Sequence, residues 1–344
     1  LSDALTNSSG GTVGIGTGAL AADDGSANKN TALGYQALND ATTGHSNTSV
    51  GYQAGDKITT GYNNTILGSA AAGYATTGHS NTLLGHGTGN TITTGYRNVA
   101  IGVDAMVGGG FATVNGVFGY QYITGHDNIA LGTASQEKVT TGNFNIAIGS
   151  EALRYNTSGR DNVAIGQYAY GGNALLTTGS ENTAVCFKAM YSGRDPSYNA
   201  AFGRHALFRA GGSYNTGRGG NAGVATTTGA NNTFLGYLAG NTTTTGTNNT
   251  LLGYDAEASS ATVSNEITLG NTAITKFRIP GLNFIIKDST ATDNYVLTVD
   301  SNGEAGWEAA AGGATSINGL SDALTNSSGG TVGIGTGALA ADDG

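Results

Sequence analysis

A short tandem repeat constrains the fold of this chain more than any other feature. Its core is Asn, a β-branched residue, a variable residue, an aliphatic residue and Gly, as in NTALG and NVAIG. The Gly recurs every seventeen positions at Gly34, Gly51, Gly68, Gly85, Gly102 and Gly119, resumes after a shortened coil at Gly132, Gly149 and Gly166, and continues through Cys186, Gly203, Gly236, Gly253 and Gly270. A unit this short with two-residue alternation predicts stacked β-coils and excludes helix-pair repeats.

We expect each coil to contribute two short strands to a parallel β-solenoid, with coils about 4.8 Å apart. The residues three before and one before the Gly, such as Thr31 and Leu33, are expected to face the coil interior. The small residue between them, such as Ala32, would then lie with the Gly on a nearly flat outer face. Thr-Thr-Gly marks the turns, where a positive φ costs Gly nothing.

Such a coil has a thin core. With roughly two large apolar side chains inside each coil, a lone solenoid would hardly offset the entropy lost on ordering the chain. Small residues let backbones approach closely. We therefore expect the flat Ala/Gly face to pack against two further copies of the chain, in a homotrimer.

An Asn occupies the same place in every unit, four residues before the aligned Gly or Cys. At a corner, its side chain can satisfy turn backbone groups and also bond the identical Asn of the next coil. We interpret these residues as a structural ladder. They are Asn30, Asn47, Asn64, Asn81, Asn98, Asn115, Asn128, Asn145, Asn162, Asn182, Asn199, Asn232 and Asn249.

The units NVAIG, NIAIG and NTALG resemble the repeats of trimeric autotransporter adhesin heads. The longer unit TTGxxNTxxGYQA is similar to repeat arrays in phage tail fibres and related bacterial surface proteins. The resemblance covers about residues 12–270. It implies a left-handed parallel β-roll built as a homotrimer. The adhesin-head unit is shorter than the present one and lacks the Thr-Thr-Gly arm.

A second, longer repeat joins the two ends of the chain. Residues 1–25 recur unchanged as residues 320–344. Because surface loops tolerate change, folding alone does not demand identical loops. We therefore expect one complete module over residues 1–319 and the start of the next, in a tandem array. The alternative is a segment duplicated at the two ends of one chain.

The period divides the chain into five parts. We expect a linker or neck over 1–11, the solenoid over 12–270, a β-hairpin connector over 271–311, a Gly-rich linker over 312–319 and the next module over 320–344. Within the connector, YVLTVD and EAGWEA alternate in polarity, and Asn302-Gly303 between them is typical of a tight hairpin turn.

Charge and motifs exclude several classes of function. The 14 Lys and Arg against 23 Asp and Glu give a formal net charge of −9, which argues against nucleic acid as a partner. No apolar run approaches the roughly 18 residues of a membrane span, so we expect no membrane insertion in this segment. The five His lack metal-ligand spacing, and no nucleophile or phosphate-binding motif is present. We predict no catalytic residues, no cofactor and no metal, and we expect Cys186 to be an inert core residue.

Three functions compete. The first is a structural or adhesive extracellular fibre at a cell surface or on a virion, either a surface adhesin or a tail-fibre shaft. The second is an ice-binding solenoid, suggested by Thr pairs at 42–43, 59–60, 76–77 and 93–94, although adjacent Thr point to opposite faces. The third is a glycan-active protein like some tail spikes, which would need paired acids. Glu151, Glu181 and Asp195 are the scattered candidates.

If the fibre is adhesive, the irregular coils are where we expect a receptor to bind. The stretch Gly203–Gly236 interrupts the period and concentrates cations and aromatics. Its candidate contacts with a cell-surface glycan or protein receptor are Arg204, Phe208, Arg209, Tyr214 and Arg218. Insertions in solenoids emerge as loops on one face, and an equally simple interpretation is a tolerated decoration.

Overall fold

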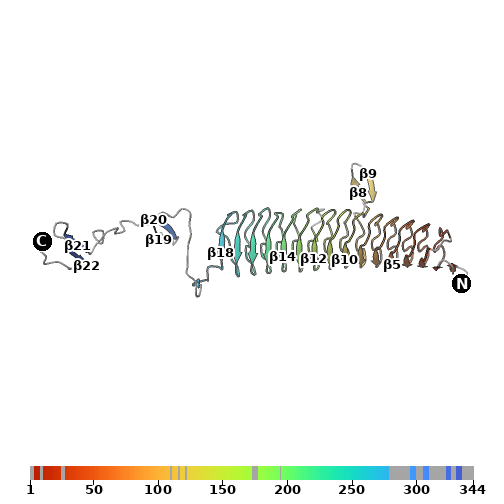
Figure 1. Cartoon of the computed structure of the whole chain (residues 1–344), viewed down its shortest axis with the longest axis horizontal. Coiled ribbons are helices and arrows are strands. Elements are labelled where there is room, and N and C mark those ends of the chain that lie inside the picture. The colour runs from red at the N-terminus through yellow and green to blue at the C-terminus, as the bar shows by residue number, and fades with distance from the viewer. Residues whose placement is uncertain are drawn as a thin grey trace. The chain divides into compact units, whose positions relative to one another are not determined.

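In a computed structural model the chain divides into two units, Leu1–Thr275 and Lys276–Gly344 (Figure 1). The described residues are 4–7, 11–24, 28–108, 111–114, 117–120, 122–172, 177–193, 195–278, 295–299, 305–309, 323–326 and 331–334. Every regular element among these residues is a β-strand, and none is a helix.

The first unit is organised around one sheet of 16 short strands. Its strands are β1 (Ala4–Asn7), β2 (Thr12–Ile15), β3 (Thr31–Leu33), β4 (Thr48–Val50), β5 (Thr65–Leu67), β6 (Thr82–Leu84), β7 (Val99–Ile101), β10 (Ile129–Leu131), β11 (Ile146–Ile148), β12 (Val163–Ile165), β13 (Thr183–Val185), β14 (Ala200–Phe202), β15 (Thr216–Arg218), β16 (Thr233–Leu235), β17 (Thr250–Leu252) and β18 (Ile267–Leu269). A separate hairpin comprises β8 (Phe111–Val114) and β9 (Val117–Tyr120).

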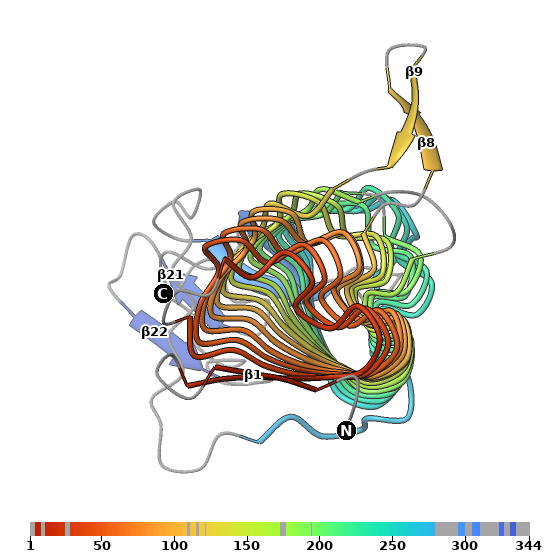
Figure 2. The ribbon, with the colours of Figure 1, turned by 90° about the vertical axis from the view of Figure 1, so that its right-hand side faces the viewer.

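The predicted parallel β-solenoid is confirmed. From β2 to β18 each strand pairs in parallel with the strand of the next coil, in matched register, as when Ala147 lies opposite Ala164. Within this sheet, β1 alone runs antiparallel to its neighbour, and it pairs with β2. Viewed along the axis, the coils lie one behind another (Figure 2). Each coil contributes one short strand, and not the two expected, because its remaining residues form turns.

The expected inward and outward faces of the strand were wrong. The middle strand residue points inward: Ala32 is 1 % exposed, while Leu33 beside it is 46 % exposed. Most of the strands in the parallel series repeat this exposed–buried–exposed pattern or a half-exposed form of it. Since strand side chains alternate between faces, one misassigned position reverses the whole strand. The small residues therefore line the core, and the flat Ala/Gly outer face does not exist.

In several coils the strand residue that faces the core is small, because a larger side chain from the following corner fills the interior. Ala147 at a strand centre accompanies buried Leu153 on the corner that follows, and neither side chain is exposed. Leu83 accompanies Gly89, where an added Cβ would lie 2.8 Å from both Leu83 methyl carbons. Large and small residues thus exchange places between the two positions in these coils, as close packing of an interior requires, whereas Gly217 and Gly223 are both small.

The aligned Gly is required by its backbone. At Gly149, φ is +127°, and an added Cβ would lie 2.7 Å from the carbonyl carbon of Gly166 in the next coil. L-residues rarely adopt this conformation. Cys186 occupies the same place with φ of +97° and is exposed, so the prediction of an inert core residue is corrected.

Two departures from the period were assigned wrongly. The solenoid passes directly from β7 to β10, and the extra residues between them carry the β8–β9 hairpin. Gly119 lies in β9 and is not an aligned Gly, and Asn115 lies outside the described residues. Conversely, Gly203–Gly236 contains no insertion, because β15 ends just before Gly219, which occupies the aligned place with φ of +137°.

The second unit contains two described strand pairs. β19 (Tyr295–Val299) pairs antiparallel with β20 (Ala305–Ala309), within the range expected for a hairpin; the Asn302-Gly303 turn lies outside the described residues. β21 (Ala323–Asn326) pairs antiparallel with β22 (Thr331–Ile334). Ala323 lies opposite Ile334, as Ala4 lies opposite Ile15 in β1 and β2. The duplicated segment therefore forms the same strand pair at both ends, and the range predicted as a linker contains β1.

We predict that the large and small residues of one coil can be exchanged by mutation. Gly89→Met alone and Leu83→Ala alone should each destabilise the protein by about 2–4 kcal/mol, through overpacking and a cavity respectively. The double variant should recover most of that loss, because it reproduces the next coil, where Ala100 accompanies buried Met106. Chemical denaturation of the four proteins measures the coupling. Additive losses in the double variant would contradict the exchange.

Candidate binding surfaces

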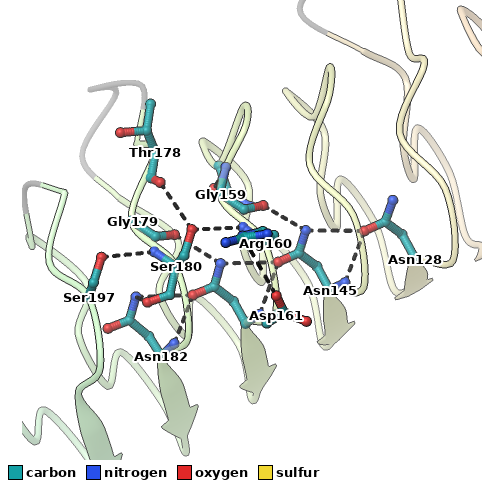
Figure 3. Close-up of polar contacts among 12 residues, drawn as sticks. Asn128, Asn145, Gly159, Arg160, Asp161, Thr178, Gly179, Ser180, Asn182 and Ser197 are labelled. Atoms are coloured by element: carbon teal, nitrogen blue, oxygen red, sulfur yellow. Dashed lines mark hydrogen bonds and ion pairs between the residues drawn. The ribbon is translucent and has the colours of Figure 1, made fainter.

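A continuous ladder of Asn side chains runs along one corner of the solenoid (Figure 3). Asn145 donates its backbone N–H to Oδ1 of Asn128 at 3.0 Å, and its side-chain amide to the same oxygen at 3.1 Å. That amide also donates to the Gly159 carbonyl at 2.9 Å, and Asn162 donates in turn to Oδ1 of Asn145. Asn145 is fully buried. Each Asn therefore joins its own corner to both neighbouring coils.

The ladder includes one residue that the sequence analysis missed. Asn98 is followed directly by Asn128, and Asn215 stands between Asn199 and Asn232. Asn215 was overlooked because its coil holds Gly217 and Arg218 in place of the usual aliphatic residues. The residues joined in this way are Asn30, Asn47, Asn64, Asn81, Asn98, Asn128, Asn145, Asn162, Asn182, Asn199, Asn215, Asn232 and Asn249. Their amides are used within the fold and offer no free group to a ligand.

The Thr pairs form a second ladder at the neighbouring turn. The hydroxyl of Thr59 donates to the Thr76 carbonyl at 3.2 Å, and the hydroxyl of Thr76 donates to the Thr93 carbonyl at 3.2 Å. The second Thr of each pair, such as Thr60 or Thr77, is exposed. Both Thr are exposed only at 42–43, and the other three pairs each present one exposed Thr. The pairs thus give a single file where a flat ice-binding array would need two.

The outward strand face forms a long apolar stripe, which we call the apolar ridge. It consists of the third residue of each strand from β3 to β18. Nine of its members are 37–49 % exposed: Leu33, Leu67, Ile101, Ile148, Ile165, Phe202, Leu235, Leu252 and Leu269. Val50, Leu84, Leu131 and Val185 are half-buried, and Arg218 is the one charged member. At about 4.8 Å per coil the ridge is about 60 Å long, and soluble monomers rarely expose an apolar surface so extended.

The predicted receptor contacts lie on three different faces. Arg218 belongs to the apolar ridge, in β15. Tyr214 stacks on Tyr198 at a centroid distance of 4.9 Å, beside the Asn ladder. Only Arg204, Phe208 and Arg209 lie together, on the corner that follows the strand. The structure therefore does not bring the five residues into one site.

The corner that follows β12 to β14 carries a group of rings, which we call the aromatic corner. Tyr191 stacks on Phe208 at 5.5 Å and meets Tyr168 edge-on at 5.9 Å. Phe187 and His205 add a further ring contact at 5.7 Å. The rings belong to consecutive coils, since Tyr168 follows β12, Tyr191 follows β13 and Phe208 follows β14. Sequence analysis could have found the remaining rings by aligning the corner positions of all coils.

Cations accompany these rings. The Lys188 ammonium lies 5.5, 5.2 and 5.0 Å from the ring centroids of Tyr168, Phe187 and Tyr191. Burial lowers the pKa of His205, and the positive charges of Arg204 and Lys188 lower it further. His205 is therefore neutral near pH 7 and can act as a hydrogen-bonding group.

The candidate carboxylates do not assemble into an acid pair. Glu151 binds Arg154 at 2.6 Å, and Asp195 accepts hydrogen bonds from Thr178. The carboxylate that joins Glu151 is Glu137, through the shared Arg154. Desolvation opposes ionisation of Glu137, but hydrogen bonds from Lys138 and Arg154 outweigh it and lower its pKa. A general acid needs the opposite shift. Across the described residues, no cluster of three His, Cys, Asp or Glu could hold a metal.

An ion pair joins the two coils that flank the β8–β9 insertion. Arg97 donates to both carboxylate oxygens of Asp127 at 2.7 Å, and His126 lies 2.7 Å from the same carboxylate. The bonds from Arg97 lower the pKa of Asp127 to about 2. This pair adds a side-chain contact between the coils on either side of the insertion, which β7 and β10 already join through their backbones.

We predict that the Asn ladder contributes much of the stability. Asn145→Ala should cost about 3 kcal/mol or more, because it leaves the buried Asn162 N–H without an acceptor and removes the side-chain bonds to both neighbouring coils. Asn143→Ala is the control, since the Asn143 side chain accepts only the His126 N–H, and should cost about 1 kcal/mol. Chemical denaturation measures both. Equal losses would contradict a special role for the ladder.

A pH prediction follows from Asp127. Its folded pKa lies below the ordinary value of 3.8, so its stabilisation is present above about pH 4 and is lost as the pH falls toward 2. Asp127→Asn should lower stability by about 1 kcal/mol or less at pH 7 and by a small part of that at pH 2, where the folded carboxyl is about half protonated. Asp161→Asn is the matched control, because Asp161 has the same φ of 56° and a 3.9 Å pair with Arg160. Thermal unfolding between pH 2 and pH 7 tests this, and a difference of the same size at pH 2 as at pH 7 would contradict it.

Within the described part of the chain, no helix is long and apolar enough to cross a membrane. Comparison with known protein families, curated proteins and solved structures finds no match to this chain.

Proposed function

We propose that this chain is part of a homotrimeric extracellular fibre with an adhesive role, at a cell surface or on a virion. Three solenoids pack through their apolar ridges about a common axis. The single observation that carries the proposal is the ridge itself, which presents an exposed or half-buried apolar side chain on every solenoid strand from β3 to β18 except β15, where Arg218 stands.

The ridge is suited to packing against copies of itself. Its members repeat at the coil spacing, so two identical ridges match in pitch along their whole length. Leu67, Ile101 and Ile148 carry no charge that burial would leave unpaired, and burying apolar surface contributes about 25 cal/mol per Å². The face proposed to pack against the other copies is thus the aliphatic face of the strands, and not the Ala/Gly face expected from the sequence.

The duplicated segment supports an array of modules. β21 and β22 repeat the pairing of β1 and β2, so the same sequence opens the same kind of structure twice. In the proposed fibre, the hairpin of β19 and β20 lies in the connector between successive modules. A chain of such modules would make a filament of regular axial repeat.

We expect no enzymatic activity. Among the described acidic groups, Glu137 and Glu151 are engaged by Arg154, and the lowered pKa of Glu137 disfavours general acid catalysis. Polysaccharide or ester cleavage that is abolished by changing one of these carboxylates would refute this expectation.

Charge placed on the ridge should dissolve the trimer. Ile148→Lys and Ile165→Lys change exposed side chains, so each coil should still fold, while three charges would be buried near the axis. Thr141→Lys, at an exposed turn away from the strand, is the control. Sedimentation should show trimers for the parent and the control and monomers for the ridge variants. A stable monomer of the parent at micromolar concentration would overturn the proposal.

Arg218 offers the reverse experiment. It is the one charged member of the ridge and donates no hydrogen bond or ion pair to any described residue. Arg218→Leu should therefore strengthen association, because it removes the cost of burying three guanidinium groups. Dilution experiments on the parent and the variant compare their dissociation constants. An unchanged or weaker association would place Arg218 outside the interface.

A further inference from the structure

The stack of aromatic rings at the aromatic corner ends at Phe208, and no ring from the next coil continues it. Tyr191 and Phe208 occupy the same position in consecutive coils and stack with their planes 27° apart. The next coil has Val224 at this position, which is too short to continue the stack. A cavity of about 310 Å³ lies at this step, lined by His205, Phe208, Arg209, Val224 and Ala225. The side of Phe208 that faces away from Tyr191 therefore borders a recess of ligand size.

The recess is cationic in a chain that is acidic overall. Arg209 lines it, and Arg204 lies close enough to His205 to affect its titration. Neither arginine forms an ion pair with a described carboxylate, in contrast to Arg97 and Arg154. The chain has a formal net charge of −9, so unpaired cations gathered at one place are a local exception. They would attract an anionic group to the edge of the recess.

An aromatic ring face beside a guanidinium group is suited to one class of ligand, an acidic sugar. The C–H bonds on one face of a sugar ring carry small positive charges and pack against the negative face of an aromatic ring. A carboxylate on the same sugar can be bound by the fork of an arginine. The neutral imidazole of His205 can exchange hydrogen bonds with hydroxyl groups. An acidic peptide would satisfy the arginines but has no flat C–H face for Phe208.

We propose that this recess binds an acidic saccharide, with a sugar ring packed on Phe208 and its carboxylate held by Arg209. The site specifies the receptor chemistry of the proposed adhesive role and rests on that role. It does not depend on trimer formation, because Phe208 and Arg209 lie on the corner after the strand and not on the apolar ridge.

Titration calorimetry on the full chain tests the proposal. The probes are oligosaccharides of glucuronic acid and of sialic acid, a neutral glucose oligomer and oligo-glutamate. At least one acidic saccharide should bind, and Arg209→Ala and Phe208→Ala should each weaken it about tenfold or more. Phe208→Leu keeps the apolar packing but removes the ring, so it should also weaken binding. Arg160→Ala, an exposed arginine at another corner, should bind as the parent does.

Other outcomes overturn the proposal. Binding of the neutral oligomer as tightly as the acidic ones would remove the role of Arg209, and equal binding of oligo-glutamate would remove the role of the ring. Absence of binding to either acidic saccharide by folded chain would remove the site. If the parent still adheres to cells and Arg209→Ala adheres equally, adhesion stands and this site is wrong. If the parent adheres to no cell surface, the adhesive role itself fails.

Discussion

The fold depends on the need to satisfy backbone polar groups at a corner that every coil must turn. A buried turn contains N–H and C=O groups that cannot pair with a neighbouring strand. Leaving such a group without a hydrogen-bond partner costs more free energy than a satisfied hydrogen bond contributes. The Asn amide meets this need along and across the coils at once, since one oxygen accepts from two donors of the next Asn. Coil spacing, strand register and the position of the aligned Gly all follow from keeping that amide in place.

The sequence predicted the features that backbone chemistry imposes. Asn145 and Gly149 recur because no other residue fits those positions as well, so their spacing revealed the parallel stacking. The prediction from sequence failed where two opposite orientations of a strand satisfy the same alternating pattern. Ala147 and Ile148 alternate whichever one faces inward, and the deciding information lies in Leu153, which fills the interior from the corner. The β8–β9 insertion was missed for a related reason, because Gly119 falls on the period by coincidence of spacing.

The candidate sites show the same division. Arg204, Phe208 and Arg209 could be singled out by composition, because cations are scarce in this chain and two of them flank an aromatic residue here. Composition does not single out their neighbours Tyr168 and Tyr191, which belong to preceding coils; only an alignment of the corner positions of all coils would have placed them beside Phe208. A solenoid presents separate longitudinal faces, and here one is apolar, one is occupied by amides and one carries rings and cations. Association and recognition can therefore change independently.

The stacking of coils also determines how the protein would respond to tension. Successive coils are joined by bonds that run along the solenoid, such as the one from the Thr250 N–H to the Glu266 carbonyl at 2.8 Å. No described strand pairs with the outer edge of β18, whereas β2 is covered by β1. A pull on the chain beyond β18 would peel away the last coil first, because that coil is bonded to a neighbouring coil on one side only. Each such event would release about 55 Å of chain, because the residues of one coil extend by roughly 3.3 Å each. Elongation would thus proceed in equal steps from one end, and a filament of this kind could dissipate a sudden load without losing its remaining coils.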